Sequence, residues 1–401
     1  MCDTKKKGKG QLLYVLSIAG FAAGIAAALI FPALFDKIGF IGTIYVNLLK
    51  LIVIPLLMAE MCSAAAHSTG GVNAGRIIAL FCMMFVLTYL LTAALVAAIA
   101  PGEGVDLFGD EWSGELASVS LADFFTSLFP SSIFTAMADG SLLPCLIFAY
   151  ALGAAARKTD SGRLVEVADE LRDTLRRLLD WIMYITPAGV FSLIGSAVAQ
   201  HGSEIFGVCA RYIATAWGCS AAALLLIMLL PACVAAPMSP LRYIKSMAKV
   251  WIVSLSTCSS AATLPTTIRV CNEDFGVSER ITDMVVPLGC TIHMCGGAVS
   301  FCLLGLFTMQ MQGVTPSLGM FLYMLLVATL MNMAAPGIPG GGIVLGATYL
   351  TILGAPTGFI GLYSGIYRLL DMAYTTLNVS GDVTANLILA RLERGTAERE
   401  R

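Results

Sequence analysis

Apolar segments about as long as a membrane span follow one another along the chain, separated by short polar stretches. A helix crosses a bilayer with about 20 apolar residues, so each segment is predicted to be a transmembrane helix. Residues 124–156 are apolar too, but Pro130, Asp139 and Pro144 interrupt them, and we expect short helices there. The uninterrupted segments of the first half cover residues 12–35, 40–66, 77–100, 178–199 and 206–236.

The second half shows a different pattern, because small residues and prolines break two apolar stretches at their middle. These stretches, about 246–270 and 321–353, are predicted to be re-entrant hairpins of two short helices; two ordinary kinked spans are the alternative. Each is followed by a span with polar residues, at about 281–307 and 359–390. A hairpin and a helix occurring twice in this order are typical of inverted-repeat transporters, whose site lies at the hairpin tips. The predicted fold is an all-α polytopic membrane protein of eight transmembrane helices plus two hairpins.

The composition agrees with a membrane protein, since 58% of the residues are hydrophobic and only 12% are charged. Soluble domains carry about 25% charged residues. The net charge of −2 gives no basic footprint for a nucleic acid. Lys and Arg gather in residues 1–10, in residues 157–177 and in the tail 394–401, so the positive-inside rule places these parts in the cytoplasm.

The last apolar segment carries a narrow polar stripe. At about 100° per residue, Thr375, Asn378 and Asp382 fall within about 40° of Asp371 around a helix, and so does Tyr367. A carboxylate inside hydrocarbon is costly and must face protein or a water-filled cavity. Two carboxylates with hydroxyl and amide groups between them indicate a cation site, whereas a solvated surface helix would not be this apolar.

The span before the second hairpin contains glycines that favour local unwinding, from Gly289 to Gly297. Unwound backbone offers carbonyl oxygens to cations. His293 and Cys295 lie two residues apart in this stretch. Two such side chains do not make a coordination shell, so a transition-metal site is disfavoured.

These residues resemble the dicarboxylate/amino acid:cation symporter family, which has the glutamate-transporter fold. The resemblance is carried by Ser259-Ser-Ala-Ala-Thr-Leu-Pro265, by Gly337-Ile-Pro-Gly-Gly-Gly342 and by Asp371 with Asn378-Val-Ser-Gly-Asp382. It implies a homotrimer in lipid that works as an elevator. Residues 11–239 would form mainly the scaffold, with the third and sixth spans joining the transport domain, and residues 240–393 would form the core of that domain.

The resemblance also implies a substrate site. Asp371 would bind the α-ammonium of an amino acid, Thr375 and Asn378 would contact its polar groups, and both hairpin tips would close over its carboxylate. Helix N-termini at such tips favour anions. The implied residues are Ser259, Ser260, Thr263, Gly297, Pro339, Gly340, Gly341, Asp371, Tyr374, Thr375 and Asn378.

Sodium ions are the co-transported ligands that the resemblance implies, and no enzyme cofactor is expected. One ion would bind at Gly289, His293, Asn378 and Asp382. A second would bind at Thr291, Met294, Asn332, Met333 and Ala335 as the second tip closes. Ion and substrate would then share one closed state, so each would raise the affinity for the other.

Three departures from the family pattern affect the expected substrate and ions. The arginine that pairs an acidic side chain is replaced by Tyr374, which cannot make a bidentate pair with a carboxylate. This favours a neutral amino acid as the substrate. An acidic substrate stays the alternative, because Arg368 could pair with its second carboxylate. Asp371 itself disfavours plain dicarboxylates, which have no ammonium group.

The motif Asn-Met-Asp-Gly-Thr of the family reads His293-Met-Cys-Gly-Gly297 here. Cys295 in place of the aspartate predicts loss of a third sodium site with Tyr89 and Thr92, and resembles the serine/threonine transporter branch. A histidine titrates near neutral pH, so His293 makes proton coupling the alternative to sodium.

The sequence therefore predicts a sodium-coupled symporter of serine, threonine or alanine. A proton-coupled symporter and a carrier of acidic amino acids or dicarboxylates are the alternatives. A channel would need polar rings along a pore, and an enzyme would need a catalytic constellation; the pattern favours neither. Short loops favour the plasma membrane of a prokaryote.

Overall fold

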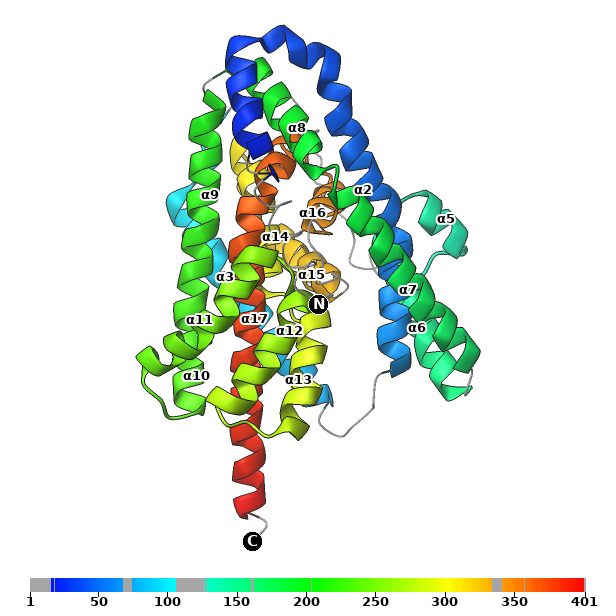
Figure 1. Ribbon diagram of the computed structural model, residues 1–401, viewed down its shortest axis with the longest axis vertical. Helices are drawn as coiled ribbons and strands as arrows, with labels where there is room; N and C mark the ends of the chain where they lie inside the picture. The colour runs from blue at the N-terminus through cyan, green and yellow to red at the C-terminus, as the bar shows by residue number, and fades with distance from the viewer. Residues whose placement is uncertain are drawn as a thin grey trace, which may run out of the picture. The chain divides into compact units, whose positions relative to one another are not determined.

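The computed structural model describes residues 16–17, 19–67, 74–105, 126, 128–159, 162–202, 204–333, 341–356 and 358–399. Throughout these residues the regular structure is helical, with no strand (Figure 1). The helices of the first part are Ala19–Ile30, α2 (Pro32–His67), α3 (Ala74–Ile99), α5 (Ile133–Ala138), α6 (Leu142–Lys158), α7 (Gly162–Met183), α8 (Thr186–His201) and α9 (Glu204–Ala223). The short helices α5 and α6 confirm the interruption predicted in residues 124–156.

The second part consists of shorter helices until the last one. They are the π-helix η1 (Leu224–Leu229), α10 (Leu230–Ala235), α11 (Pro240–Thr257), α12 (Ser260–Arg269), the π-helix η2 (Val270–Asp274), α13 (Glu279–Ile292), α14 (Cys295–Met311), α15 (Leu318–Met333), α16 (Gly341–Ile352) and α17 (Ile360–Arg399). α11 and α12 lie where the first hairpin is predicted, and α13 with α14 lies where the span 281–307 is predicted. α15 and α16 lie where the second hairpin is predicted, but the residues that join them are outside the described ones, so that hairpin stays a prediction. The first hairpin begins at Pro240 because Ser239 caps that helix, its side chain accepting from Arg242 N.

Several helices are long and apolar enough to cross a membrane. Among the described residues these are Pro32–His67, Gly75–Ile99, Glu204–Ala235 and Glu279–Met311, and α7 with α8 forms a fifth candidate bent by 52°. α17 is also long enough, at 40 residues, but carries charged groups along its length. The number of eight spans stays a prediction.

The chain forms two compact units. Unit 1 comprises Met1–Gly70, Asp106–Ile205 and Ile343–Gly365, and unit 2 comprises Gly71–Val105, Phe206–Gly342 and Ile366–Arg401. The division into scaffold and transport domain that the resemblance implies is not tested by this partition and stays a prediction.

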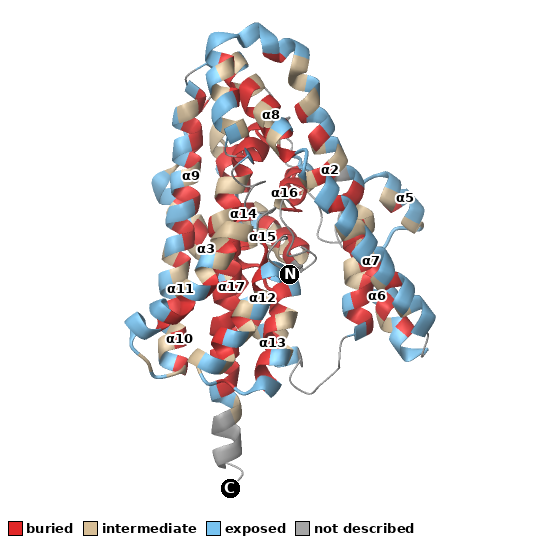
Figure 2. Cartoon of the chain, in the orientation of Figure 1, coloured by how far each residue is buried: buried red, intermediate tan, exposed pale blue. Residues whose placement is uncertain are grey.

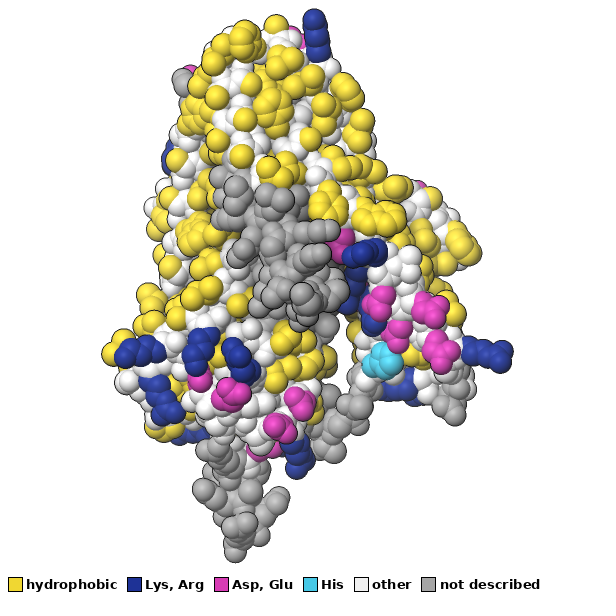
Figure 3. All heavy atoms as spheres, in the orientation of Figure 1, with side chains coloured by type: hydrophobic (Ala, Val, Ile, Leu, Met, Phe, Trp, Pro, Cys, Tyr) yellow, Lys and Arg dark blue, Asp and Glu magenta, His cyan; other side chains and the backbone are white. Residues whose placement is uncertain are grey.

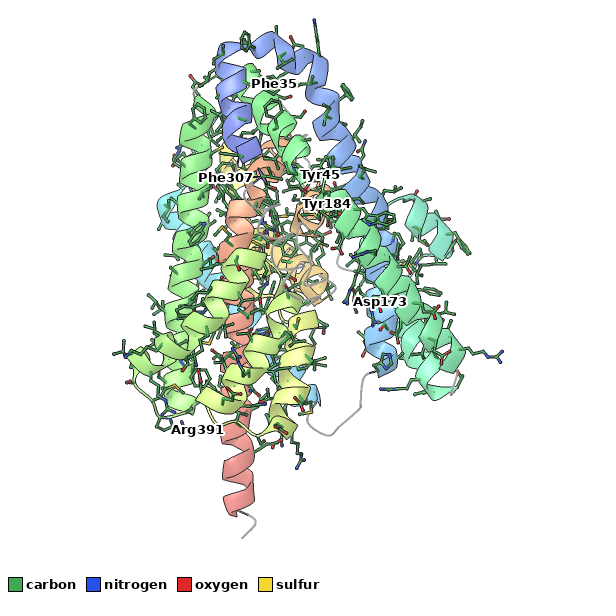
Figure 4. The ribbon with its side chains drawn as sticks, in the orientation of Figure 1. Phe35, Tyr45, Asp173, Tyr184, Phe307 and Arg391 are labelled. Carbon is green, nitrogen blue, oxygen red and sulfur yellow. The ribbon has the colours of Figure 1, made fainter. Side chains whose placement is uncertain are left out.

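In unit 1, α2 packs against α6, α7 and α8. The Tyr45 hydroxyl on α2 accepts a hydrogen bond from Thr186 Oγ1 on α8 at 3.2 Å; the Tyr45 side chain is labelled in Figure 4. Arg176 on α7 makes two hydrogen bonds to Glu60 on α2, of 2.5 and 2.8 Å. α2 also exposes apolar side chains, as expected for a lipid-facing helix; they are Leu34, Phe40, Ile44 and Leu51. Figure 3 draws the hydrophobic side chains on the visible face in yellow.

In unit 2, α3 packs against α14, and α11 packs against α12 as the first hairpin. The two hairpin helices meet at Cys258, which has a positive φ of 49°, and Ser259. Ser259 caps α12, because its side chain accepts a hydrogen bond from Ala262 N at 3.2 Å. Most of α14 and α17 is buried, as the red ribbon in Figure 2 shows.

Three polar contacts join α11 to α17 at residues spaced four apart on α17. Ser254 Oγ and Thr376 Oγ1 lie 2.9 Å apart, and Trp251 Nε1 donates to Ser380 Oγ at 2.8 Å. The Tyr243 hydroxyl lies 3.4 Å from Thr384 Oγ1. Residues four apart share one face of a helix. The three contacts, called the ladder below, therefore lie on one face of α17, and this face is turned away from Asp371.

Candidate functional site

The polar stripe predicted on α17 is present and buried. Asp371 is 7% exposed and Asp382 is 2% exposed. Thr375 and Asn378, between them, are buried as well. Thr375 Oγ1 donates a hydrogen bond to Asp371 Oδ1 at 3.1 Å. The helix therefore holds two carboxylates inside protein, as their cost in a membrane requires.

The chain of unit 2 unwinds where the glycines predicted it, at His293 and Met294 between α13 and α14. The break brings the His293 ring onto α17, where Nδ1 lies 3.0 Å from Asp382 Oδ1. The other ring nitrogen, Nε2, lies 3.1 Å from Cys295 Sγ. The ring stacks on Phe81 with 4.3 Å between centroids and 6° between planes. His293 is thus fixed on three sides.

Two glycines allow this approach. A Cβ built on Gly381 would lie 2.7 Å from His293 Cε1, and one built on Gly289 would clash with Asp382 Oδ1. The four residues of the first implied ion site are therefore partly assembled: Gly289, His293 and Asp382 are in contact. Asn378 is turned to α14, since its Oδ1 accepts from Gly296 N at 2.6 Å.

The first turn of α14 packs directly on the backbone of α17. A Cβ on Gly296 would clash with the backbone carbonyl of Tyr374. Tyr374 itself is 2% exposed. The side chain that replaces the family's arginine is therefore inside the protein, next to the Asp371 stripe.

Gly296→Ala is expected to destabilise the protein by about 2 kcal/mol or more, because the atoms that must shift are backbone. Gly218→Ala is the control: it lies in the helix α9 with nothing near its Cβ, and should be neutral or stabilising by about 0.5 kcal/mol. Thermal unfolding of the purified protein measures both. Equal melting temperatures for the two variants would contradict the packing of α14 on α17.

The first hairpin tip lies near the Asp371 turn. Arg368, one turn before Asp371 on α17, donates from Nη2 to the Thr257 carbonyl next to this tip at 3.4 Å. The predicted tip residues Ser259, Ser260 and Thr263 are all buried. Thr263 Oγ1 donates a hydrogen bond to the Ser259 carbonyl at 2.8 Å.

α15 and α16, the two helices of the predicted second hairpin, are described, and residues 334–340 between them are not. Tyr367 packs its hydroxyl against Gly342, where a Cβ would clash, so the start of α16 lies beside the stripe. Gly341 is the first residue of that helix. Pro339, Gly340 and Ala335 lie outside the described residues, as does the side chain of Met333.

Only some of the residues implied for the second ion site are buried near one another. Met294 and Asn332 are buried, and Asn332 Oδ1 lies 2.5 Å from a Cβ built on Gly297. Thr291 is exposed, and its hydroxyl donates to the Leu288 carbonyl at 2.7 Å. Tyr89 and Thr92, named for a third site, are buried on α3, where Thr92 Oγ1 donates to the Thr88 carbonyl.

Sequence reasoning missed the partners of several site residues. The family resemblance placed His293 and Asp382 at one ion site, but it did not give the direct ring contacts of His293 to Asp382 Oδ1 and Cys295 Sγ or its stacking on Phe81. It treated Asn332 as a source of a backbone carbonyl and overlooked its side chain. The only sequence signal for either was a polar residue inside an apolar helix.

In unit 2, an unwound stretch between two helices lies beside a buried carboxylate. This arrangement is typical of a polytopic membrane carrier. Residues 13–392 match the model of the sodium:dicarboxylate symporter family, and the chain belongs to this family. This confirms the resemblance seen in the motifs. The chain is a symporter and not an enzyme.

The names of similar proteins mention different substrates. The human neutral amino acid transporter A is 26% identical over 96% of this chain and 82% of its own length. The proton/sodium-glutamate symport protein of Bacillus caldotenax is 28% identical over 93% of each chain. The mouse excitatory amino acid transporter 3 is 25% identical over 99% of this chain and 88% of its own.

Proposed function

We propose that this symporter carries a small neutral amino acid, such as serine, threonine or alanine, together with sodium. The observation that carries the proposal is the buried Asp371 with Tyr374 one turn along the same helix. It would work as a homotrimeric elevator in the plasma membrane of a prokaryote.

The charge of the site favours a neutral substrate. Asp371 offers one carboxylate to the α-ammonium, and Thr375 fixes its Oδ1. Tyr374 offers no cation to a second carboxylate of the substrate. Arg368 is directed to the Thr257 carbonyl at the end of α11, where an arginine is also favoured by the helix dipole. This supports a neutral amino acid as the substrate, as in the name of the human transporter A, rather than glutamate, as in the name of the Bacillus caldotenax protein.

The remaining groups are proposed to bind the carboxylate and the ions. Ser259, Ser260 and Thr263, with Gly297, Pro339, Gly340 and Gly341, would surround the α-carboxylate and side chain. One sodium ion would bind at Gly289, His293, Asn378 and Asp382, and another at Thr291, Met294, Asn332, Met333 and Ala335. No covalent step is needed.

Proton coupling is the second candidate, and the contacts of His293 favour it. Its ring bridges a carboxylate and a thiol, 3.0 Å from Asp382 Oδ1 and 3.1 Å from Cys295 Sγ, and the ring is fully buried. A histidine so placed can carry a proton between the two states of a carrier.

Uptake of labelled serine into proteoliposomes separates the two. An inward sodium gradient at uniform pH should drive uptake that saturates with serine concentration, and an inward proton gradient without sodium should not. Uptake with protons alone would establish the second candidate. No uptake of serine, threonine or alanine under either gradient would contradict a neutral substrate and direct the search to aspartate and glutamate.

Asp382→Asn should raise the sodium concentration for half-maximal serine uptake by about tenfold or more, because a carboxylate ligand of the ion becomes neutral. Asp283→Asn is the matched control, since Asp283 is exposed on α13 in the same unit, and it should leave the sodium dependence unchanged. Sodium dependence in Asp382→Asn equal to that of the native protein would place the ion elsewhere.

A further inference from the structure

Asn386 lies on α17 one turn after Asp382 and continues the same polar stripe. At about 100° per residue it falls about 40° from Asp382 around the helix, and the Cβ atoms of residues four apart lie about 5–6 Å from each other. Asn386 is fully buried. The stripe therefore extends past the residues implied for the first ion site, toward the C-terminal end of the helix.

The amide of Asn386 is oriented by one hydrogen bond, which leaves its oxygen without a donor. Nδ2 donates to Thr282 Oγ1 of α13 at 3.1 Å, and Thr282 is fully buried too. Oδ1 has no hydrogen-bond partner among the described residues. Since buried polar atoms nearly always have partners, this oxygen points to a ligand that binds in the working protein.

Two asparagines flank Asp382 on the stripe, and their oxygens differ. Asn378, one turn before Asp382, uses Oδ1 to accept a hydrogen bond from Gly296 N at 2.6 Å. Asn386, one turn after Asp382, keeps its Oδ1 available within the described part of the chain. A cation that leaves the Asp382 carboxylate therefore meets an available amide oxygen in the direction of the C-terminal end of α17.

α13 follows the stripe from the ion site to Asn386. Its Gly289 meets Asp382, since a Cβ there would clash with Oδ1, and its Thr282, two turns earlier, meets Asn386. Residues seven apart lie on one face of a helix, so both contacts use the same face of α13. Between them this face carries Val285 and Val286, which are buried and apolar. The next oxygens that this face offers after Asp382 are therefore those at Thr282 and Asn386.

An amide oxygen beside a hydroxyl suits a monovalent cation in transit. Both groups are neutral, so they attract a cation less strongly than a carboxylate does. A site that passes an ion on must bind it firmly enough to admit it and weakly enough to let it leave. Two turns beyond Asn386, the half-buried Glu393 falls about 40° from Asp371 around the helix, and the tail predicted to be cytoplasmic follows it.

We propose that Asn386 Oδ1, with Thr282 Oγ1, forms a transfer site that the co-transported sodium ion passes after leaving Asp382 and before reaching the cytoplasm. This inference rests on the proposed sodium coupling and adds a site outside both implied ion sites. The ion occupies this site only in passing. The site therefore sets the rate of sodium release and not the affinity for the ion held at Asp382.

Two modes of serine transport in proteoliposomes of the full chain test the site. Net uptake, driven by an inward sodium gradient into a sodium-free lumen, requires release of the ion in every cycle. Exchange of labelled for unlabelled serine, at saturating sodium on both sides, does not require it. Asn386→Leu should lower the maximal rate of net uptake by about tenfold or more, because the ion would cross apolar surroundings there, and should leave the exchange rate as in the native protein.

Three further variants separate the site from a structural role. Thr282→Val should lower net uptake in the same way, whereas Asn386→Thr keeps an oxygen there and should retain it. Asn272→Leu is the matched control, because Asn272 Oδ1 also lacks a partner among the described residues but belongs to η2 and not to the stripe. A sodium titration of the melting temperature without serine should give one half-saturating concentration for the native protein and Asn386→Leu.

Four results would overturn the inference. The first is unchanged net uptake in Asn386→Leu. The second is an equal loss of exchange and net uptake, which would mark the amide as structural. The third is a clearly raised half-saturating sodium concentration in Asn386→Leu, since the amide would then be a ligand of the ion at Asp382. The fourth is a loss of net uptake in Asn272→Leu as large as that in Asn386→Leu.

The failure of this inference can be told from failure of the proposed function. If serine uptake needs sodium in the native protein and in Asn386→Leu, and the two net rates are equal, sodium symport stands and only the transfer site is wrong. If native uptake is independent of sodium, the proposed coupling is wrong as well.

Discussion

Asp371→Ala is expected to abolish amino-acid binding and to leave the fold intact. The carboxylate is buried on the stripe of α17, so a bound ammonium would face an apolar methyl group and lose its partner. Removing one partner of a buried ion pair costs about 3–5 kcal/mol. Affinity should therefore fall by about a hundredfold to a thousandfold or more. Isothermal titration of the purified protein with serine at saturating sodium measures the loss.

Asp283→Ala serves as the control for this experiment, because Asp283 is exposed on α13 and far from the stripe in sequence. It should bind serine as the native protein does. Native-like affinity in Asp371→Ala would remove the ammonium assignment. A lower melting temperature in Asp371→Ala alone would instead mark the carboxylate as structural.

Tyr374→Arg should shift selectivity from neutral to acidic amino acids. The position is buried next to the stripe, and a guanidinium there can pair with a second carboxylate through two hydrogen bonds. Hydrogen bonds to charged groups contribute about 1.5–3 kcal/mol each, so aspartate should gain at least tenfold in affinity while serine loses. Competition of unlabelled amino acids against labelled serine and labelled aspartate measures the ratio.

Tyr374→Phe provides the comparison for that variant, since it keeps the ring and removes the hydroxyl. It should retain preference for neutral amino acids. If Tyr374→Arg gains no affinity for aspartate or glutamate although it folds and binds sodium, the substrate side chain is oriented away from residue 374. The acidic alternative would then depend on Arg368 alone.

The stripe on α17 could be predicted because helical periodicity alone places Asp371, Thr375 and Asp382 on one side. The break between α13 and α14 could be predicted because Gly289 and Gly297 bracket it. Both features depend on local sequence. The hairpin break at Cys258 and Ser259 is of the same kind, since small residues and a capping serine stop one helix and start the next.

The contacts of His293 could not be predicted, because they join three segments separated by many residues. Periodicity shows that a side chain is buried but not which partner it meets. The family resemblance placed Asp382 at the same ion site as His293, but nothing in the sequence indicated their direct contact or the stacking on Phe81. The direction of the Asn332 amide depends on the space above Gly297 in the same way. Packing between helices decided these contacts.

The lower part of α17 is held on its other sides as well. Arg391 donates to the Val234 carbonyl, and its position near the C-terminal end of the helix is labelled in Figure 4. Asn386 Nδ2 donates to Thr282 Oγ1 at 3.1 Å. α17 is therefore linked through side chains to α10 and α13 as well as to α11.

The ladder between α11 and α17 has a consequence for how these helices move. Ser380 Oγ donates to the Thr376 carbonyl and accepts from Trp251 Nε1. Thr376 Oγ1 likewise donates to the Met372 carbonyl and lies 2.9 Å from Ser254 Oγ. A hydrogen bond of this kind contributes about 0.5–1.5 kcal/mol. Because sliding α11 along α17 would break all three contacts of the ladder together, the first hairpin and the last helix are expected to move as one body.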